Sequence, residues 1–336
     1  MVEEEFGIVF VILVTIILVL EMVIGLIANL AVLIISRDNN KKHLTRGNSF
    51  NLNLHVVDSI ICVTIAPLTL AYVVSTRFQT PLFCYVFEGS VSFTSTASSL
   101  TLFFICLDRY YAVMAPTEPH IISTRSHVFI FLIWIFATIS FCSPFFGLKL
   151  EIFNSFNQAN NSFFTCGEII WRMEPHYIYE VIYVVTFVMT AFAMLMFYLS
   201  MSRVTRRRVA IKDALVKASL SFGVKMPPPK DTERKTLKLS SAIVLAFWIF
   251  WGPHLIVSIV AMIVWDSLAL DVARILCLLF ALMTTIIHPL LYAFMRQRFR
   301  QSFRRRWMQR ETATVGCAAY DGKIATIEVR APNNYA

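Results

Sequence analysis

Several charged and polar side chains lie inside long apolar stretches of the sequence, where an ionised group is costly unless it has a partner. Asp58 lies midway along one such stretch, Asp108 and Arg109 end the next, and His288 lies in the last. A carboxylate, guanidinium or imidazole in apolar surroundings can pair with an opposite charge or hold a small cation. No Cys/His spacing typical of a metal site occurs in the sequence. A charged residue inside a membrane span is a functional candidate by default, and its cost predicts a partner for it.

The stretches that carry these residues predict an all-α membrane protein, a bundle of seven transmembrane helices followed by a short amphipathic helix. The chain has 336 residues, of which only 15% are charged, whereas about a quarter of the residues in soluble domains are charged. Each apolar block is about long enough to cross a bilayer, and inside lipid its backbone groups must be satisfied within a helix. The blocks are residues 6–36, 50–75, 84–115, 128–150, 178–201, 237–265 and 272–295.

The basic residues predict how the chain is oriented in the membrane. The formal net charge is +9, and Lys and Arg cluster in alternate connections and after the last block. The positive-inside rule places the N-terminus outside and the C-terminus in the cytoplasm, with the plasma membrane as the expected location. The clusters therefore indicate an anionic lipid surface rather than nucleic acid as their partner. Asn160 begins a glycosylation triplet in a connection that the same rule places outside.

The sequence divides into four expected regions. Residues 1–6 form a short extracellular N-terminus, and residues 7–295 form the seven-helix domain. In residues 296–307, Phe299 and Phe303 are four positions apart among arginines, which predicts an amphipathic helix on the membrane surface. Residues 308–336 are polar and mixed, and we expect this cytoplasmic tail to be disordered.

Two cysteines at block edges are candidates for a disulfide bond. A helix rises about 1.5 Å per residue, so Cys84 and Asp108 lie about 36 Å apart, on opposite faces of the membrane. Charge placement puts Cys84 and Cys166 on the outer face, where the oxidising environment allows a disulfide to persist. The alternative is a pair of free thiols.

The motifs occur in an order that resembles the rhodopsin-like family of G-protein-coupled receptors. Asp108-Arg109-Tyr110 ends the third block, and Asn29, Asp58 and Trp134 lie in the first, second and fourth. The sixth and seventh blocks carry the remaining landmarks, which are Phe247, Trp251, Pro253, His288, Pro289 and Tyr292. The resemblance covers about residues 20–307. Residues 20–25, 53–62 and 288–294 also match one particular member of this family.

The resemblance implies a coupling site for a heterotrimeric G protein at Asp108, Arg109 and Tyr110. In the inactive state, Arg109 would pair with Glu233 and hold the third and sixth helices together. The alternative is an arginine that simply extends to the membrane surface from a helix end.

The resemblance also implies a polar pocket that holds sodium and a set of residues that switch on activation. The pocket residues are Asn29, Asp58, Ser98, Thr285 and His288; the switch residues are Phe247, Trp251, Pro253, His288, Pro289 and Tyr292. The family usually has asparagine in place of His288. The histidine could pair with Asp58 and displace the ion, so we expect no cofactor here. The alternative is a histidine that only packs in the core.

Candidate ligand-contacting residues do not define one ligand chemistry. They are Glu88, Val91, Ser95, Trp251 and His254. By resemblance, Val91 stands where amine receptors carry an aspartate, and the seventh block has no lysine for a retinal Schiff base. The proline usual in the fifth span, near Thr190, is also absent, which puts the family's fifth-helix bulge in doubt.

The predicted function is therefore a receptor that transmits the signal of an unknown extracellular ligand to heterotrimeric G proteins through movement of the sixth helix. One alternative is a constitutively active or non-signalling receptor-like scaffold. Another is a transporter or enzyme with seven spans. That reading would need an intramembrane metal cluster or paired repeats of broken helices, and the sequence contains neither.

Overall fold

The computed structural model describes seven stretches of the chain, and each of them is largely helical. They are residues 7–42, 49–74, 80–115, 121–147, 177–221, 232–264 and 268–295. Residues 1–6, Asn160, Cys166, the predicted surface helix at 296–307 and the tail at 308–336 lie outside them. Glu233 lies in a described helix, but its side chain is not described.

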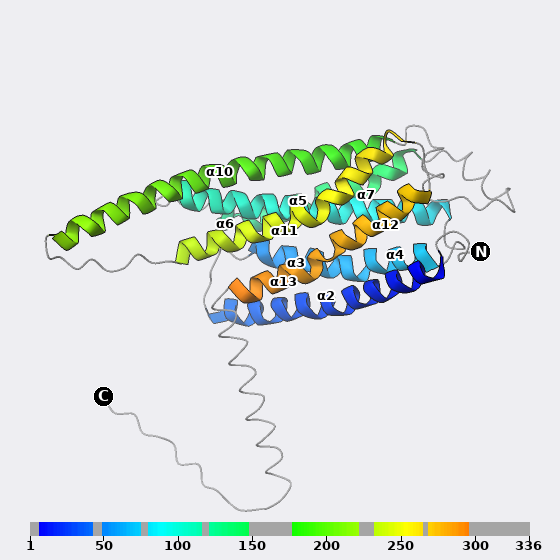
Figure 1. Ribbon diagram of the computed structural model, residues 1–336, viewed down its shortest axis with the longest axis horizontal. Coiled ribbons are helices and arrows are strands. Elements are labelled where there is room, and N and C mark those ends of the chain that lie inside the picture. Colours follow the sequence, from blue (N-terminus) through cyan, green and yellow to red (C-terminus); the bar gives the residue numbers. More distant parts are fainter. Residues whose placement is uncertain are drawn as a thin grey trace, which may run out of the picture.

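The long helices of the described residues lie side by side with their axes roughly aligned (Figure 1). In chain order the elements are α2 (Ile8–Lys42), α3 (Ser49–Val63), α4 (Ile65–Val74), α5 (Pro81–Met114), α6 (Ile121–Thr124), α7 (Ser126–Cys142), the 3-10 helix η3 (Ser143–Gly147), α10 (Tyr177–Ser221), α11 (Thr232–Ala261), α12 (Leu268–Leu282) and α13 (Thr284–Met295). This arrangement confirms the predicted helix bundle.

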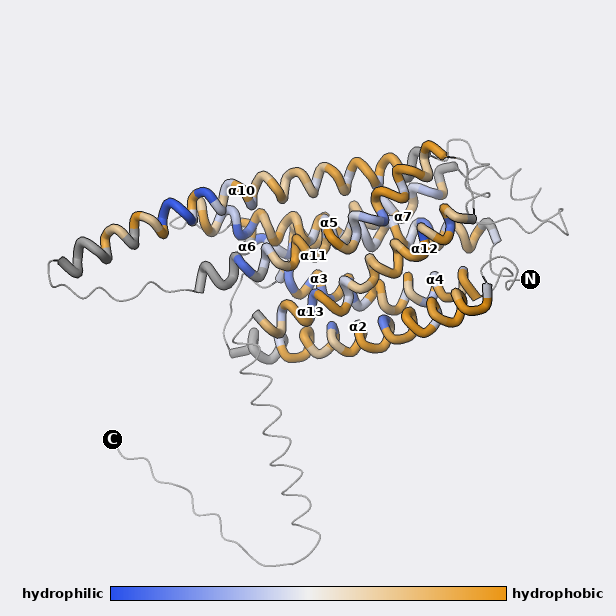
Figure 2. Tube along the Cα trace, viewed as in Figure 1, coloured by the Kyte–Doolittle hydropathy of each residue, from blue (hydrophilic) through white to orange (hydrophobic). Residues whose placement is uncertain are grey.

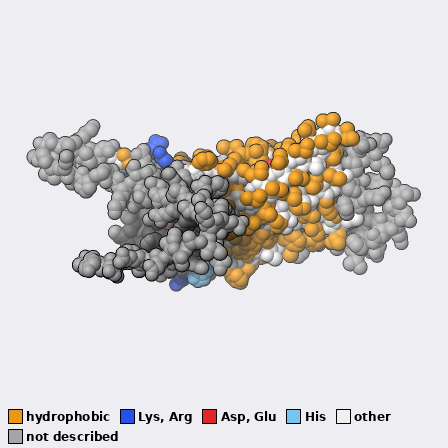
Figure 3. Space-filling view, turned by 90° about the horizontal axis from the view of Figure 1, so that it is seen from below, with side chains coloured by type: hydrophobic (Ala, Val, Ile, Leu, Met, Phe, Trp, Pro, Cys, Tyr) orange, Lys and Arg blue, Asp and Glu red, His pale blue; other side chains and the backbone are white. Residues whose placement is uncertain are grey.

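Seven segments of the described chain are long and apolar enough to cross a membrane, which confirms the predicted count. They are Ile8–Ser36, Ser49–Val74, Leu82–Met114, Ser126–Phe145, Val181–Ile211, Ser240–Ala261 and Ala269–Phe294. Large apolar side chains such as Ile27, Phe131 and Ile249 are exposed on the bundle. The face drawn in Figure 3 carries a broad band of hydrophobic side chains. A band of this extent would be unfavourable in water and is expected where lipid covers the protein.

Prolines lie in four of the spans, and one of them follows a helix break. The second span breaks at Thr64, next to Val63, whose carbonyl receives no helical hydrogen bond because Pro67 has no N–H. The Thr64 hydroxyl donates to the Ile60 carbonyl at 2.7 Å. Pro144 lies in η3, which continues the end of α7. Pro253 and Pro289 lie within α11 and α13, as spanning helices allow.

The helix α5 occupies the centre of the bundle, in contact with α3, α7, α10 and α11. Its contact with α7 is close because Gly89 has no side chain. A Cβ atom at Gly89 would lie 2.7 Å from the backbone oxygen of Phe141, nearer than real Cβ atoms come. A central helix packed on several sides is well placed to carry residues that meet the other spans.

The helix α10 runs from Tyr177 to Ser221 as an uninterrupted α-helix. Where the family usually has proline, the hydroxyl of Thr190 bonds the carbonyls of Thr186 at 2.8 Å and Phe187 at 2.9 Å. No bulge interrupts α10, as the missing proline suggested. Figure 2 shows α10 apolar along the bundle and hydrophilic further on, where Arg206, Arg207 and Arg208 follow one another.

Candidate functional site

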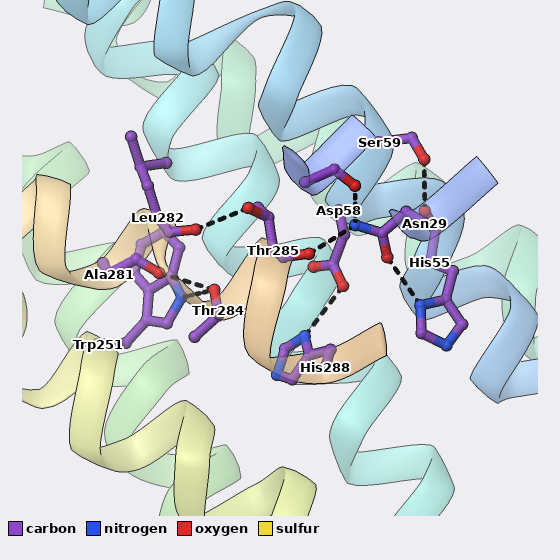
Figure 4. Close-up of polar contacts among 11 residues, drawn as sticks. Asn29, His55, Asp58, Ser59, Trp251, Ala281, Leu282, Thr284, Thr285 and His288 are labelled. Carbon is purple, nitrogen blue, oxygen red and sulfur yellow. Dashed lines mark hydrogen bonds and ion pairs between the residues drawn. The ribbon is translucent and has the colours of Figure 1, made fainter. Parts of the chain in front are cut away.

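Asp58 of α3 and His288 of α13 are in direct contact in the middle of the bundle (Figure 4). The Nδ1 atom of His288 lies 3.0 Å from Oδ2 of Asp58, and each side chain is 1% exposed. When the Asp58 carboxylate is ionised it only accepts hydrogen bonds, and Nδ1 of His288 then carries the proton between them. The contact joins two spans that are far apart in the sequence and agrees with the pairing that the sequence suggested.

Among the other oxygens of the predicted sodium pocket, two have no hydrogen-bond partner among the described residues, and one bonds its own helix. Oδ1 of Asp58 and the hydroxyl of Ser98 are buried without a hydrogen-bond partner among the described residues. The hydroxyl of Thr285 donates to the Leu282 carbonyl of its own helix at 2.9 Å. Sodium prefers several oxygen ligands, but one carboxylate oxygen here already faces a nitrogen. The pocket therefore fits sodium poorly.

Asn29 of α2 connects three helices beside this pair. Its amide nitrogen donates to the Gly25 carbonyl at 2.9 Å and to the Thr285 carbonyl of α13 at 2.7 Å. Its Oδ1 lies 2.8 Å from Nδ1 of His55 in α3. A fully buried amide that uses both of its ends fixes the relative positions of α2, α3 and α13.

His55 is a site residue that the sequence reasoning did not select. Besides its bond to Asn29, its ring makes an edge contact with the ring of Tyr292, with centroids 5.2 Å apart. It links the switch residue Tyr292 to the polar pocket. The available signal was its spacing, because His55 lies three positions before Asp58 and thus on the same side of α3.

Gly25 allows α2 to approach this network closely. A Cβ atom there would lie 2.7 Å from Oγ1 of Thr285 and 2.8 Å from Sγ of Cys62. Thr285 is stiff at χ1 and its hydroxyl is bonded, so it cannot move aside without cost. We expect Gly25→Ala to destabilise the folded receptor by about 1–3 kcal/mol, the usual range for overpacking. The measurement is the melting temperature of the purified receptor.

Gly252→Ala is the matched control for this substitution. Gly252 is also inside a spanning helix, but a Cβ atom there would meet nothing within 4 Å. Alanine is the better helix former, so this variant should melt no lower than the wild type. If the two alanine variants melted alike, the close approach at Gly25 would not matter for stability.

The predicted aromatic switch forms a stack between α10 and α11. The ring centroids of Phe187 and Phe247 are 5.3 Å apart, and those of Phe247 and Trp251 are 5.9 Å apart. The indole nitrogen of Trp251 donates to the hydroxyl of Thr284 at 3.4 Å, and Pro253 lies two positions further in α11. Trp251 therefore connects α11 with the start of α13.

Arg109 lies at one end of α5, beside a small cavity. One guanidinium nitrogen is 3.2 Å from the carboxylate of the adjacent Asp108, and Tyr110 packs on Phe197 of α10. The cavity measures about 40 Å³ and is lined by Cys106, Arg109, Met194, Leu195, Tyr198, Met201, Ser240, Ser241, Val244, Leu245 and Trp248. Arg109 is thus enclosed by α10 and α11, while its predicted contact with Glu233 involves a side chain that is not described.

A second cavity lies towards the opposite end of α5, where three of the five predicted ligand-contacting residues meet. Glu88, Val91 and His254 line it, but Ser95 and Trp251 do not. The hydroxyl of Ser95 is buried and donates to the Ser92 carbonyl at 3.2 Å. Sequence reasoning missed the other lining residues, which are Tyr72, Phe87, Ser258, Asp271, Arg274, Ile275 and Leu278.

Cys84, at the same end of α5, is buried and disulfide-bonded. The remaining cysteines of the described residues, Cys62, Cys106, Cys142 and Cys277, are free thiols. The predicted partner Cys166 lies outside the described residues, so this pairing stays a prediction.

These features place the chain in a known class of membrane receptor. Residues 28–292 match the family of seven-transmembrane receptors of the rhodopsin type. The chain belongs to this family, which confirms the resemblance of its motifs. It is therefore a multi-pass membrane receptor and not an enzyme.

Similar proteins narrow this class. G-protein coupled receptor 22 of Rattus norvegicus is 27% identical over 343 positions, which cover 89% of this chain and 79% of the relative. The protein of the same name from Danio rerio is 25% identical, covering 89% and 74%. The histamine H2 receptor of Cavia porcellus is 24% identical over 272 positions, covering 79% and 71%. The match of residues 20–25, 53–62 and 288–294 is to G-protein coupled receptor 22, and this resemblance is confirmed.

Proposed function

We propose that the chain carries the signal of an extracellular ligand to a heterotrimeric G protein at the cytoplasmic face of the plasma membrane. The N-terminus lies outside and the C-terminus inside, following the distribution of Lys and Arg. The end of the bundle with Arg109 is then cytoplasmic, and the end with Glu88 faces the outside. A relative named as G-protein coupled supports coupling to a G protein, and a relative named as a histamine receptor supports activation by a ligand.

The observation that carries the proposal is the enclosure of Arg109 between α5, α10 and α11. A cavity of about 40 Å³ has room for only a few water-sized groups and cannot admit a protein segment. The described structure therefore supports a closed state. A G protein would enter only after α11 moves away from Arg109. It would then meet a rim that Arg206, Arg207 and Arg208 of α10 make basic.

The route from ligand to G protein follows α11. Trp251 lies one turn from His254, which lines the outer cavity, and the two rings are 5.9 Å apart. Trp251 in turn packs on Phe247, further towards the cytoplasmic end. Pro253 leaves one backbone carbonyl without its helical donor, so α11 can bend at this level. A ligand that favours the bent state would shift the population towards it.

Dissociation of heterotrimeric G proteins in cells tests the proposal. Each G-protein subtype is first measured without a ligand and then with a ligand library, at matched surface expression. At least one subtype should respond, and Arg109→Gln should abolish that response. A signal without any added ligand would favour the constitutively active alternative. Silence of every subtype, with and without ligands, would favour the scaffold and contradict the proposal.

The proposed contact between Arg109 and Glu233 makes a further prediction. We expect Glu233→Ala to raise basal G-protein activation, because Arg109 loses a partner that it has only in the closed state. The pair would lie near water, so the bias should be about 1 kcal/mol at most. Basal activation is measured at matched surface expression, and an unchanged value would count against the contact.

A further inference from the structure

The inner cavity, the one beside Arg109, reaches from the interior of the bundle to its membrane-facing surface. Met194 and Met201 of α10 line it on the inside and are each 1% exposed. Leu195 of α10 and Leu245 of α11 line it on the outside, where they are 41% and 54% exposed. Both of these leucines lie within membrane spans. The cavity therefore opens between α10 and α11 towards lipid rather than towards water.

A buried hydrogen-bond donor lies beside this cavity. The indole of Trp248 in α11 lines it, and Nε1 of that indole is buried without a hydrogen-bond partner among the described residues. The indole nitrogens of Trp134 and Trp251, in contrast, donate to Asn53 and Thr284. An indole N–H can only donate, and a buried donor without an acceptor is costly. A guest in the cavity is the remaining source of an acceptor for Trp248.

The depth of Trp248 in the membrane excludes the ordinary sources of an acceptor. Trp248 follows Ser240, where the span of α11 begins, by a stretch of helix about 12 Å long. The hydrocarbon tails of phospholipids carry no acceptor at this depth, and the bilayer core holds no water to replace one. The guest must therefore dissolve in hydrocarbon and bring its own acceptor.

The size and charge of the inner cavity limit the guest further. Its volume of about 40 Å³ has room for a carbonyl group with its nearest methylene groups, while a longer apolar chain would stay in the lipid outside Leu195 and Leu245. The charged residue of the lining, Arg109, already lies 3.2 Å from the carboxylate of Asp108. An ionised guest at this depth would be costly. A neutral carbonyl compound fits these conditions.

We propose that the inner cavity binds a neutral ester or amide of a fatty acid, whose carbonyl oxygen accepts a hydrogen bond from Nε1 of Trp248. The molecule enters from the membrane, between α10 and α11. This site is separate from the outer cavity and goes beyond the proposed function, because it adds a second ligand whose binding needs no G protein.

The melting temperature of the purified full-length receptor in nanodiscs of saturated phosphatidylcholine tests this inference. The probe is methyl oleate, and cis-9-octadecene has a similar chain without the acceptor. Methyl oleate should raise the melting temperature with a saturable dependence on its mole fraction, octadecene should not, and the bulkier tert-butyl oleate should bind more weakly. Absence of a shift with methyl oleate, or an equal shift with octadecene, would overturn the inference. Tighter binding of ionised oleate would make Arg109 the contact and would overturn it as well.

Three substitutions locate the site. Trp248→Phe keeps an aromatic ring but removes the N–H, so it should weaken binding of methyl oleate about fivefold or more. Trp134→Phe is the matched control, because the N–H of Trp134 already donates to Asn53 at 3.1 Å, and it should leave the affinity unchanged even if the variant melts lower. Leu245→Trp should hinder entry, since Leu245 lines the cavity where it opens to lipid. Unchanged affinity of Trp248→Phe would overturn the inference.

Binding is measured without a G protein, so this inference and the proposed function can fail independently. If methyl oleate binds in a manner that depends on Trp248 but no G protein responds to the receptor, the inference stands and the proposed function fails. If a G protein responds but methyl oleate does not bind, the function stands and the inference fails. Where both hold, a guest that fills the cavity of the closed state should lower basal activation. Raised basal activation that depends on Trp248 would overturn this cavity as the binding site.

Discussion

We expect Cys84→Ser to remain inside the cell and to lose most of its surface expression. Cys84 begins the central helix α5 and is disulfide-bonded, and its predicted partner belongs to the connection between the fourth and fifth spans. Without the bond, that connection is no longer held to the end of α5. Loss of a native disulfide typically costs about 2–5 kcal/mol, which is a large share of the stability of a folded protein.

Surface labelling of intact cells, compared with total receptor, measures this effect. Cys142→Ser is the matched control, because Cys142 is a free and exposed thiol in α7. It should reach the surface like the wild type. If Cys166 is the partner, Cys166→Ser should behave like Cys84→Ser, and the double variant should be no worse than either. Normal surface expression of Cys84→Ser would show that the bond is dispensable.

The spans could be predicted because lipid imposes a length and a composition on every helix that crosses it. The apolar block at 50–75 became the span Ser49–Val74, and the block at 272–295 became Ala269–Phe294. The internal breaks of these spans were harder to place. Proline indicates where a hydrogen bond is lost, but the helix breaks themselves fall at Thr64 and Met283. Near the second break, the Thr285 hydroxyl bonds the Leu282 carbonyl, and the Asn29 amide bonds the Thr285 carbonyl that Pro289 leaves without its helical donor.

Site residues could be predicted from the sequence where they lie in a recognisable motif, and not elsewhere. Asp58 and His288 stand in recognisable segments, so their meeting could be anticipated although 230 positions separate them. Arg274 has no motif around it. Its approach to Glu88 depends on which face α12 turns towards α5, and helix rotation in a membrane is set by packing rather than by composition. The same applies to the contact of His55 with Tyr292.

The pair of Asp58 and His288 leads to the second large effect, on the response to sodium. An imidazole nitrogen 3.0 Å from the carboxylate occupies one of its oxygens. Sodium would therefore have to displace the imidazole ring before both carboxylate oxygens could bind the ion. We therefore expect sodium to change the basal signalling of the wild type little, relative to potassium.

His288→Asn should create the sodium response. Asparagine cannot carry a positive charge, so the Asp58 carboxylate is left for the ion, and the hydroxyl of Ser98, buried without a hydrogen-bond partner among the described residues, is a further candidate oxygen ligand. A ligand that stabilises one state couples to signalling by about 1–3 kcal/mol in typical cases, so basal activity should fall about fivefold or more as sodium replaces potassium. The melting temperature of the purified variant should rise over the same sodium series.

His55→Asn is the control that separates a specific effect from loss of any buried histidine. His55 contacts Asn29 and Tyr292, whereas His288 is the residue whose ring contacts Asp58, so His55→Asn removes a buried ring and keeps both members of that pair. This variant should stay insensitive to sodium even if it melts at a lower temperature. Strong inhibition of the wild-type receptor by sodium, at constant ionic strength, would show that the ion binds despite His288. The histidine would then be a packing residue beside the site, and its bond to Asp58 would belong only to the sodium-free state.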